Sequence, residues 1–109
     1  FLKQYRNVTL VKRGTEKYYE VMATAKYRVT NSTNPRTIPV RKGQTYIQTW
    51  HGTPLKTLGK SVKSEAHTIG NVQKNLLAAD YLIFPNEFTM KHMVEDYMLS
   101  NIGKSKISH

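Results

Sequence analysis

The stretch that decides the fold is residues 69–84, IGNVQKNLLAADYLIF. From Ile69 to Ala79, apolar side chains recur at three- and four-residue steps, which is the pattern of an amphipathic helix. Tyr81–Phe84 follows at once and is apolar throughout, as is typical of a strand buried inside a parallel sheet. A helix that leads directly into such a strand predicts an α/β fold.

The rest of the chain alternates between strand-like and helix-like segments. We expect further strands over residues 8–11, 27–30 and 44–50, which are rich in β-branched and aromatic side chains. We expect helices over residues 16–25, with Thr15 as N-cap, over 54–58 and over 87–99. This order predicts a Rossmann-like three-layer sandwich around a mostly parallel sheet. It occupies residues 1–103 as one domain, and 104–109 are expected to form a loose tail.

Three polar segments come directly after predicted strands, and they are candidates for a site. They are Asn31, the run His51-Gly52-Thr53, and Asn86. Ligands of open α/β sheets bind beyond the carboxyl ends of the strands, so these segments would line one edge together. Two roles are open for Asn86, because it follows a strand and precedes a helix: it caps that helix, or it contacts a substrate. The same two roles are open for Asn31.

His51 lies at the junction of a predicted strand and a predicted short helix. Gly52 permits a tight exit from the strand, and Thr53 followed by Pro54 is a typical helix start, whose free amides favour anions. Lys56 adds a positive charge one turn further on. Such surroundings favour a neutral imidazole that accepts a proton next to a bound phosphate. The simpler alternative is that His51 only packs against its neighbour in the chain and hydrogen-bonds the turn.

The blocks around His51 resemble one family in their order along the chain. They are AKYRVTNS (25–32), RKGQTYIQTWHGTPLK (41–56) and NVQKNLLAADYLIFPNEFTMKHM (71–93), and the resemblance covers about residues 5–98. This pattern is similar to the CDP-glycerol glycerophosphotransferases, the teichoic acid primases and polymerases of Gram-positive bacteria. One position departs from it, since Ser61 stands where many relatives carry an acidic residue.

The resemblance implies a GT-B fold, in which two Rossmann-like domains face each other across a cleft. It implies transfer of glycerol phosphate from CDP-glycerol to the hydroxyl end of a lipid-linked glycerophosphate chain, with CMP as leaving group and no cofactor. His51 occupies the position of the family's proposed general base. The segment would be the N-terminal, acceptor-side domain, and most donor contacts would lie in a second domain. The motif is shared by primases and polymerases, and by enzymes for glycerol and ribitol phosphate.

Composition limits the other functions. The net charge of +10 favours a polyanionic partner, and the family resemblance implies peripheral binding at the cytoplasmic face of an anionic membrane. A non-catalytic basic module that binds anionic polymer or membrane is the alternative function. We expect no nucleic-acid partner, because the chain has no recognisable motif for one. We also expect no metal site, because the chain has no cysteine and His67, His92 and His109 have no partners at ligand spacing.

Overall fold

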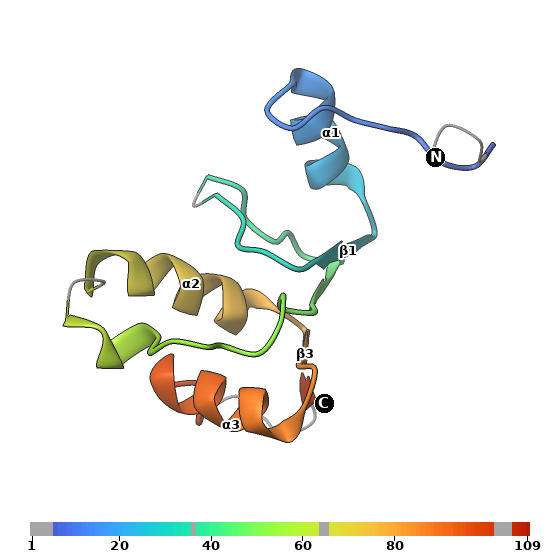
Figure 1. Cartoon of the computed structure of the whole chain (residues 1–109). Helices are drawn as coiled ribbons and strands as arrows, with labels where there is room; N and C mark the ends of the chain where they lie inside the picture. Colours follow the sequence, from blue (N-terminus) through green and yellow to red (C-terminus); the bar gives the residue numbers. More distant parts are fainter. Residues whose placement is uncertain (1–5, 36, 64–65, 102–105) are drawn as a thin grey trace.

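The computed structural model describes residues 6–35, 37–63, 66–101 and 106–109. Its centre is a parallel sheet in the order β1-β2-β3-β4 (Figure 1). The strands are β1 (Tyr27–Thr30), β2 (Thr45–Gln48), β3 (Tyr81–Ile83) and β4 (Ile107–Ser108). Each strand pairs with the next in parallel register, for example Val29 with Ile47 and Ile47 with Tyr81. The α/β class with a parallel sheet, predicted from the sequence, is confirmed.

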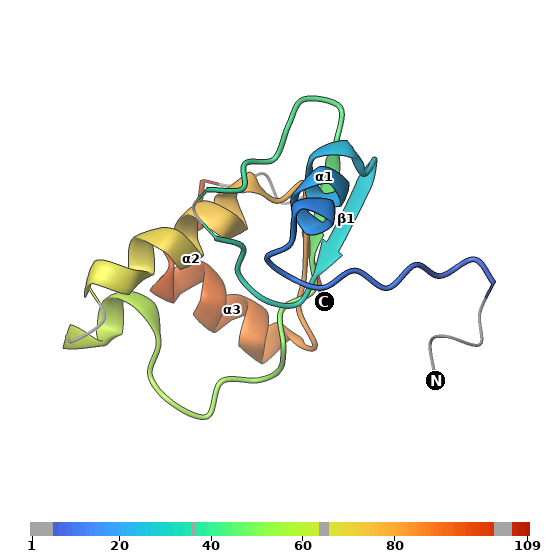
Figure 2. The same cartoon turned by 90° about the horizontal axis from the view of Figure 1, so that it is seen from above.

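Two helices cover one face of this sheet. They are α2 (Ala66–Ala78) and α3 (Glu87–Asp96), which lie side by side in both views (Figures 1 and 2). The core lies between these helices and the inward side chains of β2 and β3. Its buried apolar members are Tyr46, Trp50, Leu76, Ala79, Leu82, Phe84, Met93, Tyr97 and Leu99. The periodicity of residues 69–79 therefore identified the helix face that is buried.

The opposite face of the sheet is open in the part of the chain that the structure describes. Tyr27 and Val29 on β1 are 61% and 64% exposed, and Tyr81 and Ile83 on β3 are 51% and 41% exposed. Parallel sheets normally carry helices on both faces. Only one of the two helical layers of the predicted sandwich is therefore seen on the sheet among the described residues.

The first helix, α1 (Glu16–Thr24), lies beside the β1 end of the sheet. The Thr15 side chain accepts a hydrogen bond from the Tyr18 amide, as predicted for its N-cap. None of the helix residues is fully buried. The Gln44 amide at the start of β2 ties the helix to the sheet by donating to the Met22 and Ala25 carbonyls, at 3.0 and 2.7 Å.

Two predicted elements are wrong. Residues 8–11 form no strand, and Val8 and Leu10 are 40% and 55% exposed on a segment that runs away from the body (Figure 2). The β-branched run found no partner strand among the described residues, and β-propensity has little effect without one. Residues 54–58 form no helix: Leu55 is 99% exposed, and a helical turn begins only at η2 (Gly59–Ser61).

Two further segments are placed differently from the prediction. Ile107–Ser108, within the expected loose tail, pairs with β3 as β4, because Ile107 packs against the core. Residues 104 and 105 lie outside the described residues. The helix predicted over 87–99 ends at Asp96, since the backbone turns to a φ of 54° at Met98. Likewise β2 is shorter than residues 44–50, because Trp50 leaves the extended conformation.

Candidate active site

The end of β2 makes a sharp turn that presents His51. Trp50 has a φ of 57° and Gly52 a φ of 129°. A left-handed conformation is rare for a bulky side chain, and such strain costs on the order of 1–3 kcal/mol and concentrates at functional sites. The Trp50 ring is buried near Tyr97, with 6.5 Å between the ring centroids. Burial of this ring in the core stabilises a backbone turn that would otherwise be unfavourable.

His51 is exposed and has one defined hydrogen-bond partner. Its ring stacks on Trp50, with 4.2 Å between centroids and 28° between planes, and its Nδ1 lies 2.7 Å from the backbone carbonyl oxygen of Asn31. A carbonyl oxygen can only accept, so Nδ1 carries the hydrogen and the neutral ring has its lone pair on Nε2. The stacking of the simpler interpretation is therefore present, but the ring is also open to solvent and able to accept a proton.

The loop after His51 is joined to the start of α3. Asn86 caps this helix, since its Oδ1 accepts from the Thr89 amide at 2.8 Å. Its Nδ2 donates to Thr53 Oγ1 at 3.0 Å, and Thr89 Oγ1 lies 3.2 Å from the same oxygen. The capping role of Asn86 is thus confirmed, and the same side chain fixes Thr53. For Asn31 the structure shows a role of its backbone carbonyl towards His51.

A hollow of about 310 Å³ opens beside the histidine. It is lined by Trp50, His51, Gly52, Thr53, Pro54, Leu55, Lys56 and Leu58. The structure therefore brings His51, Gly52, Thr53 and Lys56 to one surface, with Asn31 behind the imidazole and Asn86 behind Thr53. A second hollow of about 550 Å³ continues between Lys56 and the α3 side chains Phe88 and His92.

The predicted phosphate cradle at a helix start is wrong. Residues 53–57 are not helical, so no helix N-terminus with aligned amides follows Thr53. The Thr53 hydroxyl, the expected cap, is bonded to Asn86 and Thr89 instead. The argument that a helix terminus keeps His51 neutral loses its basis with it. What orients the imidazole is the Asn31 carbonyl, a partner that sequence reasoning did not foresee.

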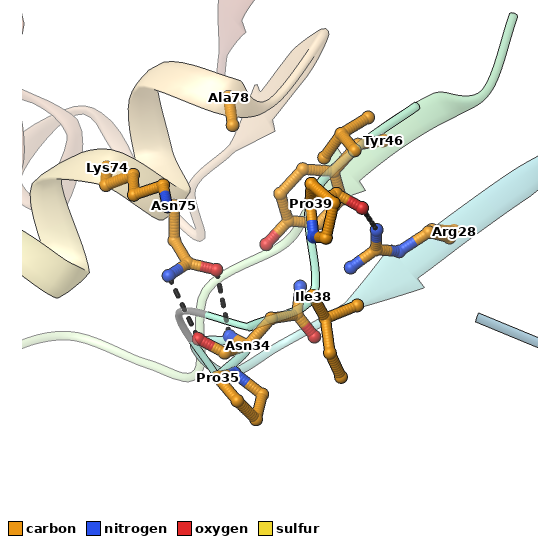
Figure 3. Close-up of a pocket in the computed structure, with 10 residues that line it drawn as sticks. Arg28, Asn34, Pro35, Ile38, Pro39, Tyr46, Lys74, Asn75 and Ala78 are labelled. Atoms are coloured by element: carbon orange, nitrogen blue, oxygen red, sulfur yellow. Dashed lines mark hydrogen bonds between the residues drawn. The ribbon is translucent and has the colours of Figure 1, made fainter. Parts of the chain in front are cut away.

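A separate cavity lies between α2 and the first two strands (Figure 3). The buried Arg28 lines it; this side chain donates to the Pro39 carbonyl and to Gln44 Oε1 and lies over the Tyr46 ring. Burial lowers the pKa of the Arg28 guanidinium. The cavity has a volume of about 30 Å³, room for roughly one or two waters. None of the predicted site residues lines it, so we do not assign it to substrate.

Two other features are absent from the described part of the chain. No group of three or more histidine, cysteine, aspartate or glutamate side chains there is placed to hold a metal ion. The side chain of His67 lies outside the described residues. Among the described helices, none is long and apolar enough to cross a bilayer.

The sequence profile of the CDP-glycerol:poly(glycerophosphate) glycerophosphotransferases matches residues 3–104. The chain belongs to this family. A teichoic acid poly(glycerol phosphate) polymerase of Bacillus spizizenii is 43% identical over 91 residues, which are 76% of this chain and 23% of that protein. A teichoic acid glycerol-phosphate transferase of Staphylococcus aureus is 32% identical over 93 residues, which are 79% of this chain and 24% of that protein.

Solved structures of a family member support the same assignment. A histidine-to-asparagine variant of the wall teichoic acid polymerase TagF superposes with a TM-score of 0.76 at 29% identity, over 91% of this chain and 25% of that chain. The same variant after a soak with CDPG gives the same TM-score and identity. The chain thus spans about a quarter of the length of these relatives. The match also agrees with the fold class expected from the resemblance to GT-B proteins.

Proposed function

We propose that this chain is the acceptor-side part of a glycerophosphotransferase, with His51 as general base. The observation that carries the proposal is the hydrogen bond from Nδ1 to the Asn31 carbonyl, which leaves the Nε2 lone pair of an exposed imidazole facing solvent. A general base needs an accessible lone pair in a fixed direction. Family membership supports transfer over the alternative of a non-catalytic basic module.

In the proposed reaction, Nε2 of His51 takes the proton from the terminal hydroxyl of the glycerophosphate acceptor. The hydroxyl oxygen forms a bond to the β-phosphorus of CDP-glycerol. The bond between that phosphorus and the bridging oxygen breaks, and CMP leaves with the bridging oxygen. Lys56, exposed on the same hollow, would approach the phosphate charge, while Thr53 and Gly52 shape the surface beside the base.

We further propose that residues 1–103 form the N-terminal acceptor-side domain and that the donor CDP-glycerol is held mainly by another part of the polypeptide. The acceptor would be lipid-linked, and the protein would bind peripherally at the cytoplasmic face of the membrane. The excess of 17 lysines and arginines over 7 acidic side chains supports this, because basic residues near an anionic surface contribute about 1 kcal/mol each.

The test is His51→Ala in the full-length protein, assayed for transfer of glycerol phosphate to a glycerophosphate acceptor. We expect kcat to fall roughly 10²–10⁴-fold, as is typical when a general base is removed. The melting temperature should stay close to that of the wild type, because His51 is exposed. His92→Ala is the matched control, since His92 is also exposed and also lies against an aromatic ring, 4.3 Å from the Phe88 centroid. If both variants turn over normally, His51 is not the base.

A further inference from the structure

Gln48, the last residue of β2, connects the two segments that hold His51. Its side chain is 1% exposed. Its Oε1 accepts from the Trp50 amide at 3.0 Å, and its Nε2 lies 3.2 Å from the Ser32 carbonyl oxygen. The same Nε2 donates to Tyr46 Oη at 3.0 Å and approaches Thr30 Oγ1 at 3.3 Å. One buried side-chain amide thus hydrogen-bonds both the segment that carries His51 and the segment that carries Asn31.

The polarity of these partners requires an amide at this position. The Trp50 N–H needs an acceptor and the Ser32 carbonyl needs a donor, and a glutamine offers one of each at the right reach. This requirement also fixes which end of the amide is oxygen. A buried network in which the backbone partners are matched in this way is rigid, and leaving any member without a partner is destabilising.

The two backbone groups that Gln48 holds belong to the immediate neighbours of His51 and of Asn31 in the chain. Trp50, in its left-handed conformation, precedes His51, and Ser32 follows Asn31, whose carbonyl accepts from His51 Nδ1. We propose that Gln48 is a positioning residue that fixes the tautomer and direction of His51 by holding both sides of this hydrogen bond. The inference rests on the proposed role of His51 as base and assigns to that base the side chain that orients it.

Loss of this restraint has a chemical consequence. When the Asn31 carbonyl moves away from Nδ1, nothing described in the structure keeps the hydrogen on that nitrogen. A ring with its hydrogen on Nε2 cannot take a proton at Nε2, the atom proposed to act as base. Partners behind a functional histidine typically change activity roughly 10–100-fold when removed. We expect a loss of that size in kcat with little change in KM, since Gln48 itself is buried and cannot touch substrate.

The direct test is the protonation pattern of the His51 ring by two-bond ¹H–¹⁵N NMR, with the signal assigned by its absence in His51→Ala. In the wild type at high pH, Nδ1 should carry the hydrogen and Nε2 should be unprotonated. In Gln48→Met, we expect the chemical shifts of the two ring nitrogens to move towards those of a mixture of tautomers. In Gln48→Glu, the acceptor for Trp50 remains but the donor to Ser32 is lost, so an intermediate shift is expected.

Gln44→Met is the matched control. Gln44 lies at the other end of the same strand segment, is 6% exposed, and also bonds backbone carbonyls, but these belong to residues 22 and 25. Gln44→Met should lower stability by a similar amount without changing the chemical shifts of the His51 ring nitrogens. The pH profile of kcat in the full-length protein should change for Gln48→Met and stay unchanged for Gln44→Met.

The outcomes separate the two proposals. Wild-type ring nitrogens and an unchanged pH profile in folded Gln48→Met and Gln48→Glu would refute the positioning role. Equal shifts in Gln44→Met would also refute it, because the effect would then be one of general stability. A tautomer shift in Gln48→Met together with full activity of His51→Ala would leave the hydrogen-bond role standing and refute the base.

Discussion

Gly59 packs the end of the loop of residues 51–58 against the C-terminal end of α3. Its replacement gives a sharp test of the structure. Its φ is +58°, and a Cβ built there would overlap the backbone carbonyl of Asp96, lying 2.8 Å from the carbonyl carbon. The left-handed conformation costs a non-glycine residue about 1–2 kcal/mol. Overlap with a packed backbone costs about 1–3 kcal/mol more. Gly59→Ala should therefore lower the free energy of unfolding by about 2–5 kcal/mol.

Gly70→Ala is the control, because it makes the same chemical change with the opposite expected sign. Gly70 lies within α2, and a Cβ there meets nothing within 4 Å. Alanine in a helix is favoured over glycine by about 0.5–1 kcal/mol, so this variant should be more stable than wild type.

The assays are urea and thermal unfolding, followed by fluorescence of Trp50, the only tryptophan, and by helical circular dichroism. At roughly 4–8 °C per kcal/mol, the Tm of Gly59→Ala should fall by at least about 8 °C. A change below about 0.5 kcal/mol for Gly59→Ala would show that the 59–61 turn does not pack on Asp96 as described, and would remove the anchor of the loop that carries Thr53 and Lys56.

Two further predictions concern the start of α3. Asn86→Ala should lower the free energy of unfolding by about 1 kcal/mol through loss of the cap, whereas Asn86→Ser should retain the cap and lose only the bond to Thr53; chemical denaturation measures both, and equal losses would contradict the assignment. The hydrogen bond and charge of Lys91 lower the pKa of Glu87, so the ionised carboxylate stabilises the fold above the usual carboxyl pKa. That contribution should disappear as pH falls through the lowered pKa: the Tm difference between wild type and Glu87→Gln should be present at pH 7 and shrink as the pH falls below the usual carboxyl range. A difference that persists at the lower pH would show another origin.

The parts of the fold that the sequence predicts well are those in which local and tertiary preferences agree. Strand β1 was predicted with its observed bounds, and the Thr15 cap and the buried stripe of α2 were also predicted correctly. In each case the same residues satisfy the backbone locally and bury apolar surface. Residues 8–11 had no such support, because no strand among the described residues pairs with them.

The failure at residues 54–58 has a specific cause. Thr53 followed by Pro54 has the local chemistry of a helix start, but the Thr53 hydroxyl is bonded to Asn86 and Thr89 on α3. A cap that is used in a tertiary contact cannot also nucleate a helix, and a single turn is too short to form without one. Gln48 was missed for a related reason. Its place on a strand predicted burial at most, while its partners lie on two loops whose path no local pattern specifies.

The proposed chemistry of the site depends on two parts, a rigid one around Trp50 and an exposed loop around Lys56. Trp50 is buried, and its amide donates to Gln48, so His51, the proposed base, projects from a fixed strand end. Leu55 and Lys56 lie on an exposed loop. A base must stay within hydrogen-bond reach of the hydroxyl it deprotonates, and small displacements are costly. A cation that meets phosphate charge tolerates movement, because electrostatic attraction falls off gradually with distance. In the proposed mechanism, the buried Trp50 thus fixes His51, the group whose position matters most, while the exposed loop with Lys56 is free to move.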